Sequence, residues 1–193
     1  MATEVSICSN ALRRLGDSPI TSLTEDSERA RLCNAFYEPS RDAILRSHTW
    51  NFAITRASLA KLSDAPAFEY ANQFALPTDP FCLRVLKMEF DDFKFKIENL
   101  AGQSRVLLTN EGEAKIIYIA RITDPSLFDS MFVDVLTAKL AVDLAYPVTN
   151  SSTLQANMQK LFERKLSEAR SLDSTEGTTD SLISTVFTDF RAP

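Results

Sequence analysis

The stretch Ser27–Leu59, SERARLCNAFYEPSRDAILRSHTWNFAITRASL, contains the change of periodicity that decides the fold. Apolar residues recur at helical spacing as far as His48, and from Phe52 they alternate with the period of two that is typical of strands. The only histidine and the only tryptophan of the chain, His48 and Trp50, lie at this change. We therefore interpret Trp50 and Phe52 as a structural joint between a helical layer and a β layer.

Helices are predicted on both sides of a central β region, from apolar spacing and from start and stop signals. Pro39 predicts a kink or a restart in the second helix, because proline removes one backbone hydrogen bond and clashes with the preceding turn. Asp124-Pro125 predicts the start of the third helix, as an N-cap followed by proline at the first helical position. The four predicted helices cover residues 3–15, a segment that ends at 48, residues 124–145 and residues 150–172.

Short apolar segments separated by turn residues fill the chain from Phe52 to Ile122. Such a pattern is typical of strands joined by tight turns, and it predicts an antiparallel meander of five or six strands. The predicted fold class is α+β: a four-helix bundle with an antiparallel β insertion between helices 2 and 3 and an extended C-terminal tail. We assign residues 1–50 and 123–172 to the helical bundle, 51–122 to a β-rich lobe and 173–193 to the tail.

The composition limits the function. The 193 residues have a formal net charge of −5, which argues against binding nucleic acid or anionic membranes through bulk charge. No apolar run reaches the length of roughly 18 residues that a membrane span needs, and the N-terminus does not resemble a signal peptide, so we expect a cytosolic protein. With four glycines, the chain has no phosphate-binding loop, and we expect no cofactor.

The three cysteines, Cys8, Cys33 and Cys82, are far apart in the sequence and lie in apolar surroundings. An odd number without short spacings argues against a disulfide framework and against a zinc site. We infer a reducing compartment and expect no bound metal.

His48 is the first residue to test for catalysis, but nucleophilic catalysis also requires a nearby nucleophile and an orienting carboxylate. Only Ser47, Thr49 and distant cysteines are available, so we favour a histidine at a helix C-terminus, where the helix dipole stabilises its cation. Two carboxylate pairs could serve glycoside hydrolysis. They lie in predicted turns, where acidic residues are ordinary, and they are Asp91 with Asp92 and Glu111 with Glu113.

Arginines on the first two helices could form a basic stripe for nucleic acid. We favour a solvated helix face with acidic partners, since Glu25, Glu28 and Asp42 are interleaved with them. These arginines are Arg13, Arg14, Arg29, Arg31, Arg41 and Arg46.

The end of the chain carries an apolar group with helix-like spacing after a polar linker. A short amphipathic segment is not stable alone in water, so it either packs on its own bundle or docks in a groove of a partner. The candidate partner-binding residues are Leu182, Ile183, Val186, Phe187 and Phe190.

Four segments together resemble the tail tubular protein A family, the head-to-tail adaptors of short-tailed bacteriophages. The resemblance spans nearly the whole chain and is strongest from Tyr118 to Pro147. The segments are SHTWNFA (47–53), ALPTDPFCLRVLKM (75–88), IIYIARITDPSLFDSMFVDVLTAKLAVDLAYPVT (116–149) and LDSTEGT (172–178).

The resemblance implies a structural virion protein rather than an enzyme. Such adaptors form a ring, usually dodecameric, between the portal protein and the tail nozzle protein, and DNA passes through the shared lumen. We expect no specific DNA binding, host cytoplasm as the place of assembly, and the head-tail interface of the virion as the final location. The alternatives are a tail-associated glycan hydrolase that uses the paired carboxylates, and a nucleic-acid-binding module that uses the arginines.

Overall fold

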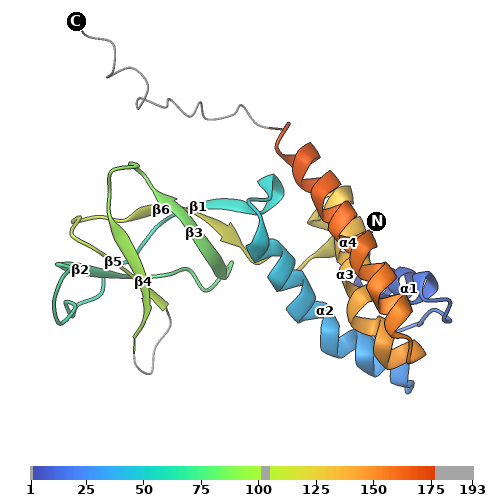
Figure 1. Ribbon diagram of the computed structural model, residues 1–193. Helices are drawn as coiled ribbons and strands as arrows, with labels where there is room; N and C mark the ends of the chain where they lie inside the picture. The colour runs from blue at the N-terminus through green and yellow to red at the C-terminus, as the bar shows by residue number, and fades with distance from the viewer. Residues whose placement is uncertain (1, 101–104, 177–193) are drawn as a thin grey trace, which may run out of the picture.

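The computed structural model describes residues 2–100 and 105–176, with the helices gathered on one side and the strands on the other (Figure 1). Each α-helix begins after a residue whose side chain accepts a hydrogen bond from the backbone of the first turn: Thr3, Ser27, Asp129 and Ser151. The α-helices are α1 (Glu4–Arg14), α2 (Glu28–Ser47), α3 (Ser130–Thr149) and α4 (Ser152–Asp173).

Helix α3 is the centre of the helical part, and the other three α-helices pack against it. By contrast, α1 and α2 contact each other only slightly. A helix surrounded in this way has to be apolar over most of its circumference. Its buried residues are Phe132, Val135, Leu136, Thr137, Ala138, Leu140, Ala141, Val142, Leu144 and Ala145.

The start of α3 differs from the prediction. Asp124-Pro125 opens a 3-10 turn, η2 (Pro125–Leu127), in which the Asp124 carboxylate accepts from the backbone of Ser126. The N-cap of α3 is Asp129, whose Oδ1 accepts from the backbone N–H groups of Met131 and Phe132 at 2.7 and 3.3 Å. The prediction that Asp124-Pro125 starts the third helix is therefore wrong: these residues start a separate 3-10 turn, and the long helix is capped by Asp129.

Neither proline inside a helix ends it. Helix α2 is continuous through Pro39, which excludes the restart but does not test the kink that was the other predicted outcome, and α3 continues through Pro147 to Thr149. Asn150 then ends α3 in the left-handed conformation, with φ of 54°. Asparagine tolerates this conformation better than most residues, which explains why the helix ends there.

The β part consists of two antiparallel sheets of three strands each, in the orders β1-β6-β3 and β2-β5-β4. Only β4 and β5 are neighbours both in sequence and in a sheet. The central strand β6 pairs with β1 through Ile54 and Ile119, and with β3 through Val85 and Tyr118. The strands are β1 (Ile54–Ser58), β2 (Asn72–Ala75), β3 (Cys82–Met88), β4 (Phe95–Asn99), β5 (Arg105–Thr109) and β6 (Lys115–Ala120).

The predicted fold class, a four-helix bundle with an antiparallel β insertion and an extended C-terminal tail, is wrong. In the described residues there are four α-helices and two three-stranded antiparallel sheets, with strands between 54 and 120 after α1 and α2, and with α3 and α4 towards the C-terminus. All four α-helices contribute to one hydrophobic core, which also includes Leu83 of β3 and Ile119 of β6, and the strands divide between two sheets instead of forming one meander. Most of the predicted tail lies outside the described residues.

Two hydrophobic cores meet at the sheet β1-β6-β3. Ile119 of β6 belongs to the core of the helical part, together with Leu83 of β3. Tyr118 of the same strand belongs to the core of the β part, together with Phe74 of β2. Because side chains alternate across a strand, β6 is apolar on both faces, and it ties the two parts together.

Candidate functional site

Trp50 is fully buried where α2 ends, between the helical part and β1. Its indole Nε1 donates to the carbonyl oxygen of Ile44 at 3.0 Å. That carbonyl belongs to the last turn of α2. The carbonyl groups of a last turn have no helical N–H group to accept from. The indole therefore fills the core and also satisfies a polar group at the helix end.

Aromatic rings surround Trp50. The ring of Phe132, from α3, meets it edge to face at 5.3 Å between centroids, and the imidazole of His48 does so at 4.8 Å. Phe52 lies 5.1 Å from Phe132 and 6.3 Å from Trp50, and Phe128 lies 5.0 Å from Phe132. Such edge-to-face pairs contribute about 0.5–1.5 kcal/mol each beyond their burial. The cluster joins the α2–β1 connection to the start of α3.

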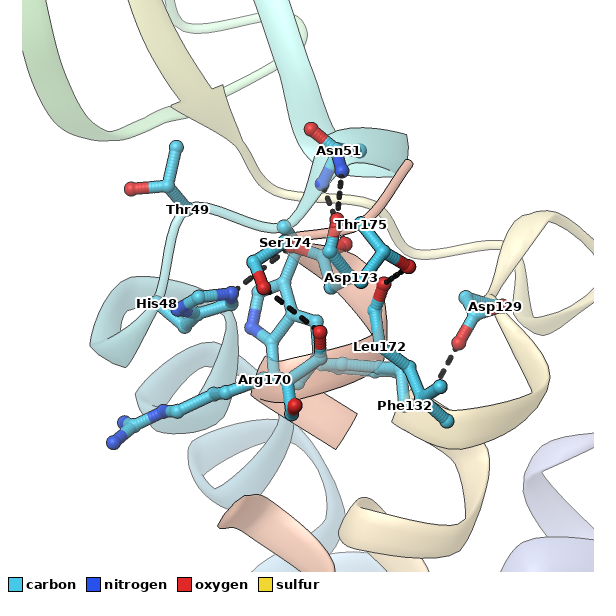
Figure 2. A network of polar contacts seen from close by, with 12 residues as sticks. His48, Thr49, Asn51, Asp129, Phe132, Arg170, Leu172, Asp173, Ser174 and Thr175 are labelled. Atoms are coloured by element: carbon cyan, nitrogen blue, oxygen red, sulfur yellow. Dashed lines mark hydrogen bonds and ion pairs between the residues drawn. The ribbon is translucent and has the colours of Figure 1, made fainter. Parts of the chain in front are cut away.

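The last residue of α4, Asp173, is bonded to the same connection (Figure 2). Its Oδ2 lies 2.9 Å from Nε2 of His48, and its Oδ1 accepts from the backbone N–H of Asn51 at 3.0 Å. The side-chain amide of Asn51 donates to the Asp173 carbonyl at 2.6 Å. We call these three contacts the Asp173 latch.

Arg170, one turn earlier in α4, reaches the end of α2. Its Nη2 lies 3.3 Å from both the carbonyl oxygen and the hydroxyl of Ser47. An arginine at this place satisfies a carbonyl that the end of α2 leaves free, and it complements the negative end of the helix dipole. The α2–β1 connection is thus held both by the hydrogen bond of Trp50 and by the end of α4.

His48 is the C-cap of α2, and Asp173 is its carboxylate partner. The hydroxyl of Ser47 donates to the carbonyl of Ile44 at 2.8 Å and so is oriented along its own helix. This arrangement holds the imidazole in place. It does not supply the nucleophile and base pair that nucleophilic catalysis requires.

The paired carboxylates lie on the surface of the β part. Asp91, Asp92 and Glu113 are exposed, and Glu111 is half-buried. Asp91 forms an ion pair with Lys87 at 3.3 Å. Exposed carboxylates of this kind are ordinary turn residues, as expected for solvated acids.

Most of the arginines of the first two helices have carboxylate partners. Arg14 pairs with Asp134 of α3, and Arg41 pairs with its neighbour Asp42. Arg29 pairs with Asp17, and Arg31 with Asp26 and Glu28. Two differ: Arg13 donates to the Asn10 amide oxygen, and Arg46 donates to the carbonyl of Leu83 in β3.

The remaining candidates are the apolar residues near the C-terminus, the three cysteines, a metal site and a membrane-spanning helix. The five apolar residues predicted to bind a partner, from Leu182 to Phe190, lie outside the described residues. Cys8, Cys33 and Cys82 are buried free thiols. Within residues 2–100 and 105–176, no cluster of three or more His, Cys, Asp or Glu side chains could hold a metal ion. No helix in the same ranges is long and apolar enough to cross a bilayer.

Asp173 was not singled out from the sequence. The domain assignment puts it in the tail, and only its position in the segment LDSTEGT marks it at all. Phe128 and Phe132 lie within the predicted third helix, residues 124–145, but the contact of Phe132 with Trp50 and that of Phe128 with Phe132 depend on tertiary packing. The sequence matches no protein-family model, and no curated protein is significantly similar to it.

Proposed function

We propose that this protein is a head-to-tail adaptor of a short-tailed bacteriophage, a structural virion subunit that forms a ring between the portal protein and the tail nozzle. The proposal is supported by the resemblance of four segments to the tail tubular protein A family. By that resemblance the ring is dodecameric, the genome passes through its lumen, and the subunit has no enzymatic role.

One observation carries the proposal: the four segments that bear the resemblance meet at the joint around Trp50. Residues 47–53 contribute His48 and Trp50, and residues 116–149 contribute Phe132. Residues 75–88 contribute Arg84, whose Nη2 donates to the hydroxyl of Thr49 at 3.0 Å. Residues 172–176, the described part of the fourth segment, contribute the Asp173 latch.

A ring subunit needs such a joint for a geometric reason. In a closed ring the same contact recurs around the circle, so an error in the angle between two parts of each subunit accumulates. Packed aromatic rings and short hydrogen bonds resist bending, because protein interiors are close-packed. The proposed role of the joint is therefore to fix the angle between the helical part and the β part.

The charge of the chain agrees with a passage for DNA. A conduit must not hold its cargo, and a subunit with net charge −5 repels phosphates on average. We expect the assembled ring to bind duplex DNA without a steep dependence on salt concentration.

The test is electron microscopy of the purified protein mixed with the portal protein of the same virus. We expect a ring of adaptor density attached to the portal. A matched sample with Trp50→Ala should show fewer complete rings or none. Portal particles that remain bare with the unchanged protein, at concentrations where both are soluble, would contradict the proposal.

A further inference from the structure

Arginine side chains from three parts of the chain converge where α2 faces the start of β3. Arg46 of α2 and Arg105 of β5 both donate to one acceptor, the carbonyl oxygen of Leu83, with the Arg105 contact at 3.4 Å. Two guanidinium groups are thus held close to each other although both are positively charged. We define the arginine cluster as Arg41, Arg46, Arg105 and Arg121.

The ring of Phe81 lies against two members of the cluster, Arg105 and Arg121. The guanidinium carbon of Arg121 lies 4.4 Å from the ring centroid, and that of Arg105 lies 5.9 Å from it. An aromatic face attracts a cation but does not neutralise it. The contact with Phe81 therefore leaves the charges of Arg105 and Arg121 unneutralised.

Asp42 is the only carboxylate that pairs with the cluster within residues 2–100 and 105–176. Its two oxygens lie 3.0 Å from Nε of Arg41 and 2.7 Å from Nε of Arg121. Four positive charges thus face one negative charge. The Arg121 contact is not aligned as a hydrogen bond, so that buried Nε keeps an unused donor. Arg41 itself is only 2% exposed.

The excess positive charge of the arginine cluster affects the nearby thiol of Cys82. Burial raises the pKa of the Cys82 thiol, whereas the charges of Arg105 and Arg46 oppose that rise. Like charges in a partly buried site repel one another more strongly than they would in water. An anion that binds between them removes this repulsion, and guanidinium groups fit carboxylates and phosphates through paired hydrogen bonds.

We propose that the arginine cluster is an oxyanion-binding site whose ligand is a carboxylate of an acidic protein segment. A nucleic acid is less suitable, because tracking a phosphate backbone requires cations spaced along the strand. Here the excess charge is confined to one place on a chain with net charge −5. The one anion already between Arg41 and Arg121, the Asp42 side chain, is itself a carboxylate. This site does not depend on the proposed role in a virion.

The test uses fluorescence anisotropy of the full chain with labelled poly-L-glutamate, compared with a labelled DNA duplex of matched charge, at low salt. We expect poly-L-glutamate to bind more tightly than DNA and to be displaced by inorganic phosphate. Arg46→Gln should weaken binding by about tenfold, the usual scale for losing a charge-assisted bidentate contact. Arg46→Lys keeps the positive charge but cannot form the paired hydrogen bonds of a guanidinium group. Its affinity for poly-L-glutamate should lie between those of the unchanged protein and Arg46→Gln.

Arg13→Gln is the matched control, since it removes an arginine of α1 that donates to the amide oxygen of Asn10 rather than to a carboxylate. It should bind like the unchanged protein. Fluorescence of the single tryptophan verifies that each variant is folded. No binding of poly-L-glutamate, equal weakening by Arg13→Gln and Arg46→Gln, or tighter binding of DNA would each overturn the proposal.

Discussion

The Oδ2 of Asp173 lies 2.9 Å from Nε2 of His48, although 125 residues separate the two in the sequence. The Asp173 side chain is 11% exposed and that of His48 22% exposed, so water screens this contact only partly. The same carboxylate also accepts from the backbone of Asn51. The end of α4 is therefore bonded to the α2–β1 connection by side-chain and backbone contacts together.

Removing the Asp173 carboxylate should destabilise the protein. We expect Asp173→Ala to lower the free energy of unfolding by about 1–3 kcal/mol, because the backbone N–H of Asn51 loses its acceptor. Asp173→Asn should cost less, because its amide oxygen can still accept from Asn51. Urea unfolding followed by tryptophan fluorescence measures both changes.

Asp26→Asn serves as the control for Asp173, because Asp26 forms only an exposed pair with Arg31. Exposed pairs of this kind contribute about 0–1 kcal/mol. If Asp173→Ala destabilised the protein no more than Asp26→Asn, the latch would contribute nothing to stability.

Trp50 should be the most sensitive position of the joint. We expect Trp50→Ala to cost about 3–5 kcal/mol, since it empties a fully buried site of its largest side chain. Trp50→Phe keeps most of the volume and removes the indole donor, while the Ser47 hydroxyl still donates to the Ile44 carbonyl, so we expect a cost of about 0.5–1.5 kcal/mol. Circular dichroism during urea unfolding is the measurement, because the fluorescent residue is lost. Equal costs for the two variants would mean that the hydrogen bond, and not the packing, dominates.

The contact of Asp134 with Arg14 and Lys165 should make stability depend on pH. Burial alone raises the pKa of Asp134, but hydrogen bonds and charges from Arg14 and Lys165 outweigh it and hold that pKa below its ordinary value of 3.8. The stabilisation is therefore present above pH 3.8 and is lost as the pH falls through the lower pKa of the folded state.

Asp134→Asn tests this dependence. The variant should be less stable than the unchanged protein near neutral pH by about 1 kcal/mol or less, since the side chain is partly exposed. The difference should disappear in strong acid. Thermal unfolding monitored by circular dichroism between neutral and acidic pH measures it, and a difference that grew in acid would contradict the assignment.

Shortening the chain separates folding from attachment. A chain that ends at Glu176 keeps every contact of the described fold, so we expect its free energy of unfolding to change by less than about 0.5 kcal/mol. We also expect it to lose attachment to the portal, because the candidate partner-binding residues from Leu182 to Phe190 are removed. Co-sedimentation with portal rings measures attachment.

A chain that ends at Leu172 is the comparison for this truncation, because it also lacks Asp173 and should be less stable. Normal attachment of the chain that ends at Glu176 would contradict the role of the removed segment. The double variant Leu182→Asp with Phe187→Asp, in the full chain, should reproduce the loss of attachment without any change of length.

The parts of the fold that local sequence determines could be predicted, and the parts that depend on distant contacts could not. Helix α1, Glu4–Arg14, lies within the predicted range 3–15, since apolar spacing and capping are local properties. The pairing of β1 with β6 could not be foreseen, because many pairings of short alternating strands bury the same apolar faces. The same holds for the site, where Trp50 was recognisable as a unique residue at a change of period but the contact of its neighbour Asn51 with the distant Asp173 was not.

Helices α1 and α2 are synthesised first, yet their main packing surface is α3, which begins only at Ser130. During translation the apolar faces of the first two helices therefore remain exposed to solvent until the ribosome has added the whole β part. The edge strand β1 likewise has no pairing strand until β6 has been synthesised. Long-range pairing of this kind slows folding, and the nascent chain is vulnerable to aggregation until α3 emerges. Folding of the chain would thus depend on early protection of these two helices.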